Sequence, residues 1–426
     1  MKPEVTTLAN GIRVASCRMP QVETVSLGMW VGVGARHEEA NEHGLSHLLE
    51  HMAFKGTASR SARRIAEEIE EVGGDLNAST GLDSTAYYAR VLKGDDKVAL
   101  ELLADILLNS SFSEEELEKE REVILQEIAG AKDDPEDIAY ELLQETAFPG
   151  QAVGRPILGT PKSVRAISAA DLKGFLGRKY APQAMVFSAA GAIDHDVWVR
   201  HVEALFGRLT PSEDGGESRA HYAGGISASG KSFEQAHLLI GFPSPSILDD
   251  DYMTAQVFSG VLGGGMSSRL FQEVREKRGL CYAIYSSVWG LRDTGMLAVH
   301  AATGVRMVDE LAKVVAGELA ALADQGPSTS EIHRAQAQLK AGLLMALESS
   351  SVRAEQMARH LLAHNRIISP AELTGRVEKV TPESVQALAR KLLSEKPTLA
   401  LVGSGRKAKE QAENAAAAIV ETVARA

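Results

Sequence analysis

The segment Gly44-Leu-Ser-His-Leu-Leu-Glu-His-Met-Ala-Phe54 joins a helical apolar pattern to three side chains that can serve a metal ion. His47 and His51 are four residues apart, so on a helix their rings lie on one face, and both can reach one tetrahedral ion at about 2.0–2.1 Å. Glu50 lies beside them and can take a proton from a coordinated water, whose pKa such an ion lowers to roughly 7. The order H-x-x-E-H is the inverse of the H-E-x-x-H zinc motif.

An isolated H-x-x-E-H match has an ordinary alternative, in which the two histidines pair with the glutamate on the surface of a helix. The apolar neighbours argue against it, because they would place the histidines against a core, and apolar walls favour a defined metal site. These neighbours are Leu45, Leu48, Leu49 and Met52.

A catalytic zinc ion with two histidine ligands needs a third protein ligand and keeps one position for water. The acidic segment Ser113–Glu127 predicts a helix, with Ser113 as the N-cap and carboxylates in the first turn. Glu116, Glu120 and Glu127 share one stripe of that helix, and a charged stripe is most often only solvated. Composition and periodicity therefore leave the third ligand open.

The spacing of these residues follows a known pattern. Glu127 follows His51 by 76 residues, and Glu120 lies seven residues earlier on the same helix face. The pattern continues in the segments Leu8-Ala-Asn-Gly-Ile-Arg-Val14, Gly73-Gly-Asp-Leu-Asn-Ala-Ser-Thr80 and Gly154-Arg-Pro-Ile-Leu-Gly-Thr160. On these residues nearly the whole chain resembles the pitrilysin/insulinase (M16) family of zinc metallopeptidases, in the bacterial branch related to mitochondrial processing peptidase. The resemblance implies that His47, His51 and Glu127 bind one Zn²⁺ per chain, that Glu50 is the general base, and that Glu120 orients a histidine.

The segment Ser268–Tyr282 matches the same family in an arginine and a tyrosine seven residues later, Arg275 and Tyr282. The resemblance implies that these two reach the substrate backbone and the developing oxyanion, where a guanidinium and a phenol supply donors. The alternative is an amphipathic helix, predicted at 269–278, whose basic face is solvated.

The resemblance also implies two contacts with substrate. An edge strand would bind an extended peptide by main-chain hydrogen bonds, which accept many sequences, and the alternative is a hairpin edge with no partner. Asp137 and Glu141, four residues apart on one helix face, match acidic residues that receive an arginine near the scissile bond, and the alternative is a solvated helix start. The edge strand contains Leu76, Asn77, Ala78 and Ser79.

The chain length of 426 residues exceeds the usual limit for one core and predicts two domains. Predicted elements recur loosely at an offset of about 210 residues, and only the first copy carries the metal motif. A Gly/Ser-rich stretch at 211–232 predicts a linker between an N-terminal zinc-binding domain, 1–210, and a homologous C-terminal domain, 233–426. Hairpin-length connections and paired helices predict an α+β class: two mainly antiparallel sheets, each covered by helices, facing each other as a clamshell.

The run Gly263-Gly-Gly-Met-Ser-Ser268 precedes a predicted helix but lacks the Gly-Lys-Ser/Thr of a phosphate-binding loop. We expect a flexible loop here. In relatives a glycine-rich loop near this place contacts substrate in a noncatalytic partner chain, and the run in this chain is short.

The formal net charge of −12 disfavours a nucleic-acid partner and suits a cationic substrate. Cys17 and Cys281 have no CxxC neighbour, which speaks against a disulfide framework and is compatible with a reducing compartment. The first residues carry no apolar signal segment, and no run of about 18 apolar residues occurs. We therefore expect a cytoplasmic protein with no membrane span.

These features together predict a zinc metalloendopeptidase that cleaves extended peptides, basic and presequence-like ones included, by attack of an activated water. Because one chain carries both the zinc motif and the Arg/Tyr pair, a homodimer is the simpler expectation, and a heterodimer with an inactive paralogue is the alternative. The alternative function is a noncatalytic structural or peptide-binding subunit of the same fold. Turnover of a peptide distinguishes the two.

Overall fold

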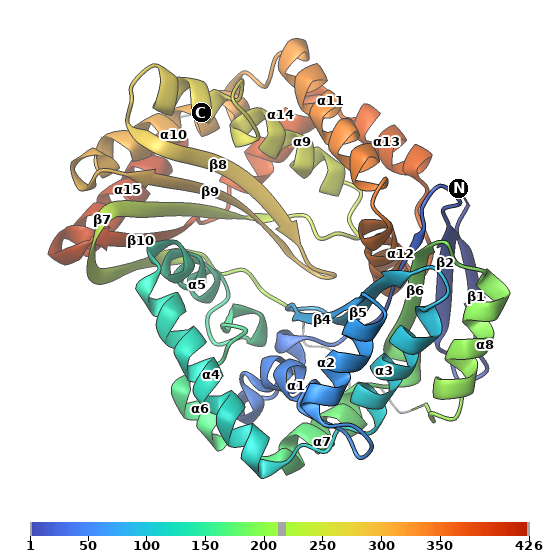
Figure 1. Ribbon diagram of the computed structural model, residues 1–426. Helices are drawn as coiled ribbons and strands as arrows, with labels where there is room; N and C mark the ends of the chain where they lie inside the picture. The colour runs from blue at the N-terminus through green and yellow to red at the C-terminus, as the bar shows by residue number, and fades with distance from the viewer. Residues whose placement is uncertain (1, 212–218, 424–426) are drawn as a thin grey trace. The chain divides into compact units, whose positions relative to one another are not determined.

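The computed structural model describes residues 2–211 and 219–423, and the chain forms two compact units (Figure 1). Each unit is built on one β-sheet with helices on both faces, which confirms the α+β expectation of two helix-covered sheets. The clamshell arrangement of the two stays a prediction. Unit 1 comprises Met1–Ile128, Pro156–Ser218 and Leu344–Ile368, and unit 2 comprises Ala129–Arg155, Arg219–Leu343 and Ser369–Ala426.

Unit 1 contains a six-stranded sheet in the order β1-β2-β6-β3-β5-β4. Of its described pairings only β2 with β6 is parallel, so the sheet is mainly antiparallel as expected. The strands are β1 (Glu4–Thr7), β2 (Arg13–Arg18), β3 (Thr24–Val31), β4 (Asp75–Thr80), β5 (Thr85–Leu92) and β6 (Met185–Gly191).

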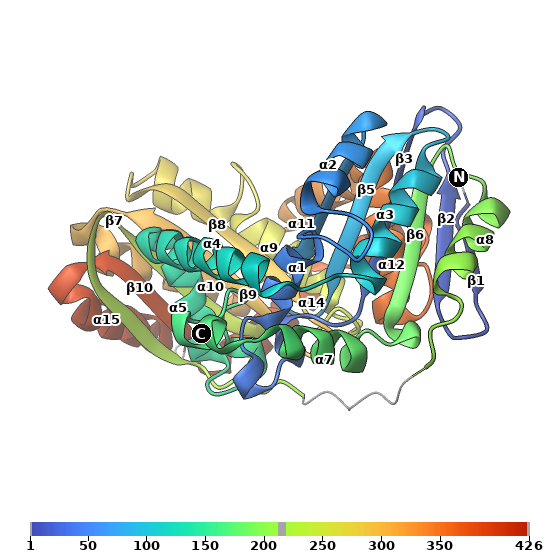
Figure 2. The same ribbon diagram turned by 60° about the horizontal axis from the view of Figure 1, so that its bottom comes forward.

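Strand β3 is apolar on both faces because both faces of this sheet are covered. Val25, Leu27 and Met29 belong to the main core of unit 1, and Trp30 belongs to a second cluster on the opposite face. Helices α3 (Asp96–Leu108) and α8 (His195–Phe206) cover the first face, while α12 (Ser350–His364) covers the second (Figure 2). The other helices of unit 1 are α1 (Leu45–Ala53), α2 (Ala62–Glu71), most of α4 (Glu114–Asp133), α6 (Pro161–Ala166) and α7 (Ala169–Lys179).

Unit 2 contains a four-stranded sheet in the order β10-β7-β9-β8. One face packs on α9, α10, α14 and α15, and the other face packs on α5. The strands are β7 (Gly225–Ser244), β8 (Cys281–Gly290), β9 (Gly295–Thr303) and β10 (Thr398–Ser404). The helices are α5 (Pro135–Ala147), α9 (Tyr252–Gly263), α10 (Val308–Asp324), α11 (Thr329–Ala346), α13 (Pro370–Glu378), α14 (Pro382–Leu393) and α15 (Ala408–Val423).

The strand registers reveal the internal repeat. Leu399 of β10 pairs with Ile226 in the first half of β7 and with Ile240 in its second half. Along β10, the residue numbers of its partners rise in the first half of β7 and fall in the second half. Strand β10 therefore lies between the two halves, parallel to the first and antiparallel to the second. The order first half of β7, β10, second half of β7, β9, β8 therefore matches β2, β6, β3, β5, β4 in unit 1. The repeat expected from the sequence is confirmed in topology.

Each sheet is covered on one face by a helix from the other half of the chain. Helix α5 precedes the expected linker but packs on β7 and β10, and α12 follows it but packs on β6 and β3. The division into contiguous domains, 1–210 and 233–426, stays a prediction. In the contact-based division of the structure, residues 129–155 belong to unit 2 and residues 344–368 belong to unit 1. Within the expected linker, residues 212–218 lie outside the described residues. Residues 225–232 form the first part of strand β7, which pairs with β10.

Two further segments differ from the sequence expectation. The predicted helix at 269–278 is a shorter π-helical turn, η5 (Phe271–Glu276), with a bond from the Lys277 amide to the Gln272 carbonyl at 2.9 Å. Of the glycine-rich run, Gly263 is the last residue of α9, where a Cβ would lie 2.5 Å from the Ser286 amide nitrogen. Residues 264–268 lie outside helices and strands, as expected of a loop. Among the described helices, none has the length and apolar content that a bilayer-spanning segment needs.

Candidate metal centre

Helix α1 presents His47 and His51 from one face, with ring centroids 4.7 Å apart. The helix ends at Ala53, one residue before the predicted end, and its apolar side faces the core of unit 1. Both histidines are therefore partly buried, as the apolar pattern predicts. The core-facing residues, all at most 1% exposed, are Leu45, Leu48, Leu49 and Met52.

The start of α1 is fixed by a buried carboxylate that sequence reasoning missed. Glu38 accepts hydrogen bonds from the backbone amides of Gly44 at 2.9 Å and Ser46 at 2.7 Å. A negative charge at this end of a helix is favoured by the helix dipole. Gly44 has a φ of +91°, and a Cβ there would lie 2.9 Å from the Cα of Gly159, so only glycine fits without strain.

The structure brings three predicted ligands together. The Nε2 atoms of His47 and His51 both lie 3.7 Å from Oε2 of Glu127, and the three donor atoms all lie within 4.8 Å of one another. A tetrahedral ion with bonds of about 2.0–2.1 Å has ligand atoms about 3.4 Å apart, so a small closure brings these donors to one ion.

The electrostatics of these donors suit a divalent metal ion. Burial, and then the neighbouring His51, lower the pKa of His47 to about 4, so its imidazole is neutral at neutral pH and offers a lone pair. Glu127 supplies a carboxylate on a side chain that is 41% exposed. Two imidazoles and one carboxylate form a donor set that binds zinc in hydrolytic sites, so the residues fit this metal.

Glu120, on the same helix as Glu127, orients His51. Its Oε2 lies 3.0 Å from Nδ1 of His51, and its Oε1 lies 2.7 Å from Nζ of Lys55. When Nδ1 carries the proton and donates to Glu120, the lone pair of His51 is on Nε2, toward Glu127. Lys55 was missed by sequence reasoning, although its place four residues after His51 on the helical pattern was a usable signal.

Glu50 lies on α1 but outside the three-donor set. The charge of Glu50 affects the pKa of two buried tyrosines, Tyr87 and Tyr180. Their hydroxyl oxygens lie 3.2 Å apart. Burial, Tyr180 and then the negative charge of Glu50 raise the pKa of Tyr87 well above its ordinary value. Burial first, and Glu50 in addition, raise the pKa of Tyr180 to about 12, although its hydrogen bonds oppose the rise. Glu50 therefore lies near two buried phenols that are neutral at neutral pH.

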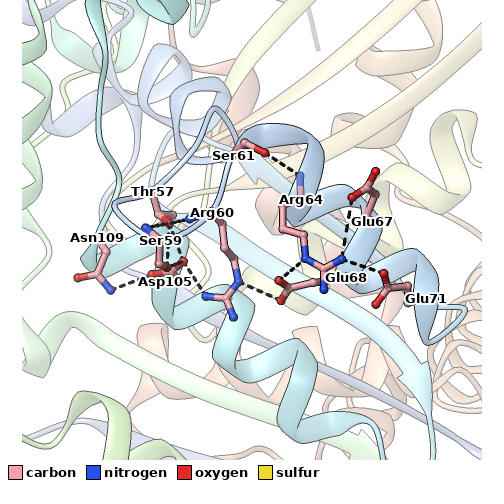
Figure 3. Close-up of polar contacts among 10 residues, drawn as sticks. All are labelled: Thr57, Ser59, Arg60, Ser61, Arg64, Glu67, Glu68, Glu71, Asp105 and Asn109. Atoms are coloured by element: carbon pink, nitrogen blue, oxygen red, sulfur yellow. Dashed lines mark hydrogen bonds and ion pairs between the residues drawn. The ribbon is translucent and has the colours of Figure 1, made fainter.

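A polar network fixes the loop that follows α1 and carries Lys55 (Figure 3). Asp105 of α3 accepts hydrogen bonds from Thr57 at 2.7 Å, Ser59 at 3.0 Å and Arg60 at 2.8 Å. The side-chain amide of Asn109 donates a further hydrogen bond to Asp105 at 2.9 Å. Burial raises the pKa of Asp105, but these four bonds together lower it below its ordinary value. The loop is thus tied to a core helix by one ionised carboxylate.

The predicted substrate strand, β4, is an edge strand of the sheet in unit 1. Among the described strands it pairs only with β5, and its Thr80 hydroxyl donates to the Ser46 carbonyl of α1 at 3.4 Å. The edge therefore contacts the helix that carries the histidines. Its four predicted binding residues alternate in exposure, since Asn77 and Ser79 are exposed, Ala78 is buried and Leu76 is partly buried.

The remaining predicted site residues belong to unit 2. The guanidinium of Arg275 lies 5.2 Å from the ring centroid of Tyr282, whose side chain is 76% exposed. Asp137 and Glu141 lie one turn apart on α5, and burial, followed by neighbouring carboxylates, raises the pKa of each. The structure brings each pair together, and the approach of either pair to the metal centre stays a prediction.

Comparison with known proteins bears on the identity of the chain. Residues 13–161 match the family described as insulinase (peptidase family M16), and residues 166–339 match the peptidase M16 inactive domain. An uncharacterized zinc protease of Rickettsia bellii is 38% identical over 94% of this chain and 97% of its own length. Another, YmxG of Bacillus subtilis, is 36% identical over 93% of this chain and 97% of its own length.

Solved structures show the same fold. A protease from Helicobacter pylori superposes with a TM-score of 0.87 at 22% identity, covering 94% of this chain and 99% of that one. A protein from Pseudomonas fluorescens titled as a peptidase M16 inactive domain superposes with a TM-score of 0.88 at 21% identity, covering 94% of this chain and 98% of that one. With the sequence matches over most of the chain, they lead to one conclusion: this chain belongs to peptidase family M16.

Proposed function

We propose that this chain is a zinc-dependent endopeptidase that hydrolyses peptide bonds in extended peptides. The convergence of the His47, His51 and Glu127 donor atoms carries the proposal, together with Glu50 on the same helix and outside the donor set. Three protein ligands with an acidic residue beside them suit a hydrolytic zinc site better than a closed structural one. Relatives named as zinc proteases support the same reading.

The donor residues would hold one zinc ion at this centre, through Nε2 of each histidine and the carboxylate of Glu127. When bound, zinc supplies a Lewis acid that polarises the scissile carbonyl and acidifies water. Glu120 accepts a hydrogen bond from Nδ1–H of His51, so the proton stays on Nδ1 and Nε2 is free to coordinate. Lys55 offsets the charge of the buried Glu120 carboxylate.

Glu50 accepts a proton from the attacking water and delivers it to the leaving amine nitrogen. Arg275 and Tyr282, in the role that the family resemblance implies, donate hydrogen bonds to the oxyanion. The substrate adds a strand to the edge of β4, where Leu76, Asn77, Ala78 and Ser79 offer main-chain groups.

Basic, presequence-like peptides are the substrate class that the acidic pair Asp137 and Glu141 favours, because both carboxylates lie on one helix face. The net charge of −12 adds long-range attraction for cationic peptides. A homodimer in the cytoplasm completes the proposal, with an inactive paralogue as the alternative partner.

The decisive experiment compares the wild type with Glu50→Gln on a mixed peptide library that includes Arg-containing peptides. The variant should keep the zinc content of the wild type and lose cleavage by about 100-fold or more, as expected for a base that is not a ligand. His47→Ala is the matched control and should lose both zinc at this centre and cleavage. Unchanged cleavage by Glu50→Gln defeats the role of the base, and a zinc-loaded wild type that cleaves nothing supports a noncatalytic subunit.

A further inference from the structure

A second cluster of metal-binding side chains lies in unit 2, apart from the H-x-x-E-H centre. Glu136, His237 and His300 each offer one donor atom, and these atoms all lie within 4.8 Å of one another. His237 is 8% exposed and His300 is 2% exposed, so two of the three side chains are buried. Nothing in the function proposed above uses these residues.

The sheet places the two histidines on one face. His237 of β7 pairs with Ala302, and His300 of β9 pairs with Leu239, so the histidines are diagonal neighbours across an antiparallel pair. Nδ1 of His237 lies 3.1 Å from Nε2 of His300. That face is the one covered by α5 rather than by the main core of unit 2.

Glu136 comes from the first turn of α5, which has a well-defined start. Asp134 caps this helix by accepting hydrogen bonds from the amides of Glu136 at 2.7 Å and Asp137 at 3.1 Å, and Pro135 occupies the first helical position. Local chemistry therefore sets the start of α5, and the packing of α5 on β7 and β10 places Glu136 over the sheet.

Two tyrosines orient the cluster. The hydroxyl of Tyr285 donates to Oε1 of Glu136 at 2.7 Å and lies 3.0 Å from the hydroxyl of Tyr140. The ring of Tyr140 stacks on His300 at a centroid distance of 6.0 Å, and the ring of Tyr285 lies 4.9 Å from it. Metal ligands in proteins are typically held by such outer hydrogen bonds and packing.

The hydrogen-bond partners of His300 leave its tautomer open. Nδ1 of His300 is buried and has no hydrogen-bond partner among the residues that the structure describes. If Nε2 of His300 donates to His237, Nδ1 is an acceptor without a donor; if His237 donates, Nδ1 carries a proton without an acceptor. Coordination through Nε2 of His300 selects the tautomer with the proton on Nδ1 and replaces the contact between the two imidazole nitrogens.

We propose that Glu136, His237 and His300 form a second divalent-metal site, which binds Zn²⁺ and fastens α5 to strands β7 and β9. Two imidazoles and a carboxylate suit zinc, and the distance of 3.1 Å between two of the donors is close to the spacing of about 3.4 Å in a tetrahedral site. We assign the site a structural role because both histidines are buried on the sheet face that α5 covers.

The test uses the full-length chain with His47→Ala and His51→Ala, which removes the first centre. After dialysis against Zn²⁺ and desalting, elemental analysis should find one zinc per chain, and Zn²⁺ should raise the Tm. Adding Glu136→Gln or His300→Gln should abolish both effects, whereas His333→Gln, an exposed histidine on α11, should leave them unchanged.

Circular dichroism of each apo variant identifies any that fail to fold. Glu136→Gln is decisive if His300→Gln misfolds, because Glu136 is only partly buried and glutamine keeps its shape. The proposal is overturned if the background variant binds no zinc, or if the Glu136→Gln chain still binds one equivalent. Because the background lacks the first centre, the result is independent of peptidase activity.

Discussion

Oε2 of Glu120 lies 3.0 Å from Nδ1 of His51, and this hydrogen bond is largely shielded from water because Glu120 is only 5% exposed. In the proposed zinc site, this carboxylate would set the tautomer of His51 without itself contacting the ion. Glu120→Gln keeps the size of the side chain but removes its charge. We expect about 10–100-fold weaker zinc binding, measured by competition with a chelator.

The matched control for this change is Glu116→Gln, one turn earlier on α4, where the carboxylate pairs with Lys119 near the surface. It should leave zinc affinity unchanged. Equal affinities of wild type and Glu120→Gln would contradict the orienting role.

Nζ of Lys55 lies 2.7 Å from the Glu120 carboxylate, and among the described residues Lys55 and His51 are its two ion-pair partners. Lys55→Met keeps the aliphatic length and removes the charge, leaving a buried carboxylate less well paired. We expect a loss of about 1–3 kcal/mol in unfolding free energy, measured by urea denaturation of the apo protein. If combining Lys55→Met with Glu120→Gln costs as much as the two single losses added together, the pairing is not energetically coupled.

Asp105 holds the loop after α1, so Asp105→Asn should destabilise the protein by about 1–3 kcal/mol at neutral pH. The pKa of Asp105 is below its ordinary value of 3.8, because its hydrogen bonds outweigh the effect of burial. A lowered pKa gives stability that is present above the unfolded value and is lost as the pH falls through the folded value.

The difference in stability between wild type and Asp105→Asn should therefore be constant near neutral pH and shrink below pH 3.8. Urea titrations at several pH values measure it. Glu101→Gln, at an exposed position on the same helix, is the control. Its stability difference from the wild type should not shrink in this way as the pH falls. A difference that stays constant down to pH 2 would rule out a stabilising ionised Asp105.

Asp137 and Glu141 are expected to recognise a basic side chain. The double variant Asp137→Asn and Glu141→Gln should lower kcat/KM for an Arg-containing peptide by about tenfold, equivalent to about 1.4 kcal/mol, and leave a matched neutral peptide unaffected. Glu145→Gln, an exposed carboxylate on the same helix, is the control. An equal loss for both peptides would assign the pair to stability instead of specificity.

Local patterns predicted the elements that position the metal centre. The apolar pattern within Gly44–Phe54 predicted the helix α1, and the acidic start after Ser113 predicted the beginning of α4. Periodicity did not single out Glu127, because Glu116, Glu120 and Glu127 share one stripe. What separates them is tertiary: Glu120 is buried beside His51, and Glu127 faces both histidines.

Long-range pairings were not accessible from the sequence. Asp105 has no signal that distinguishes it from other acidic residues on helices, and its role depends on a loop 45–48 residues away in sequence. The cluster of Glu136, His237 and His300 has no ligand spacing along the chain, since only the register of β7 with β9 brings the histidines together. The placement of α5 and α12 was missed for the same reason.

The exchange of α5 and α12 between the two halves constrains how the protein is made. While the ribosome has produced only the first 340 or so residues, one face of the first sheet, with Trp30 and Met19, still lacks Met357 and Leu361. This face of the first sheet therefore stays uncovered during synthesis until α12 (Ser350–His364) has been made. Separately expressed halves should each be prone to aggregation and should recover only when co-expressed, as complementary fragments that supply each other's missing helix.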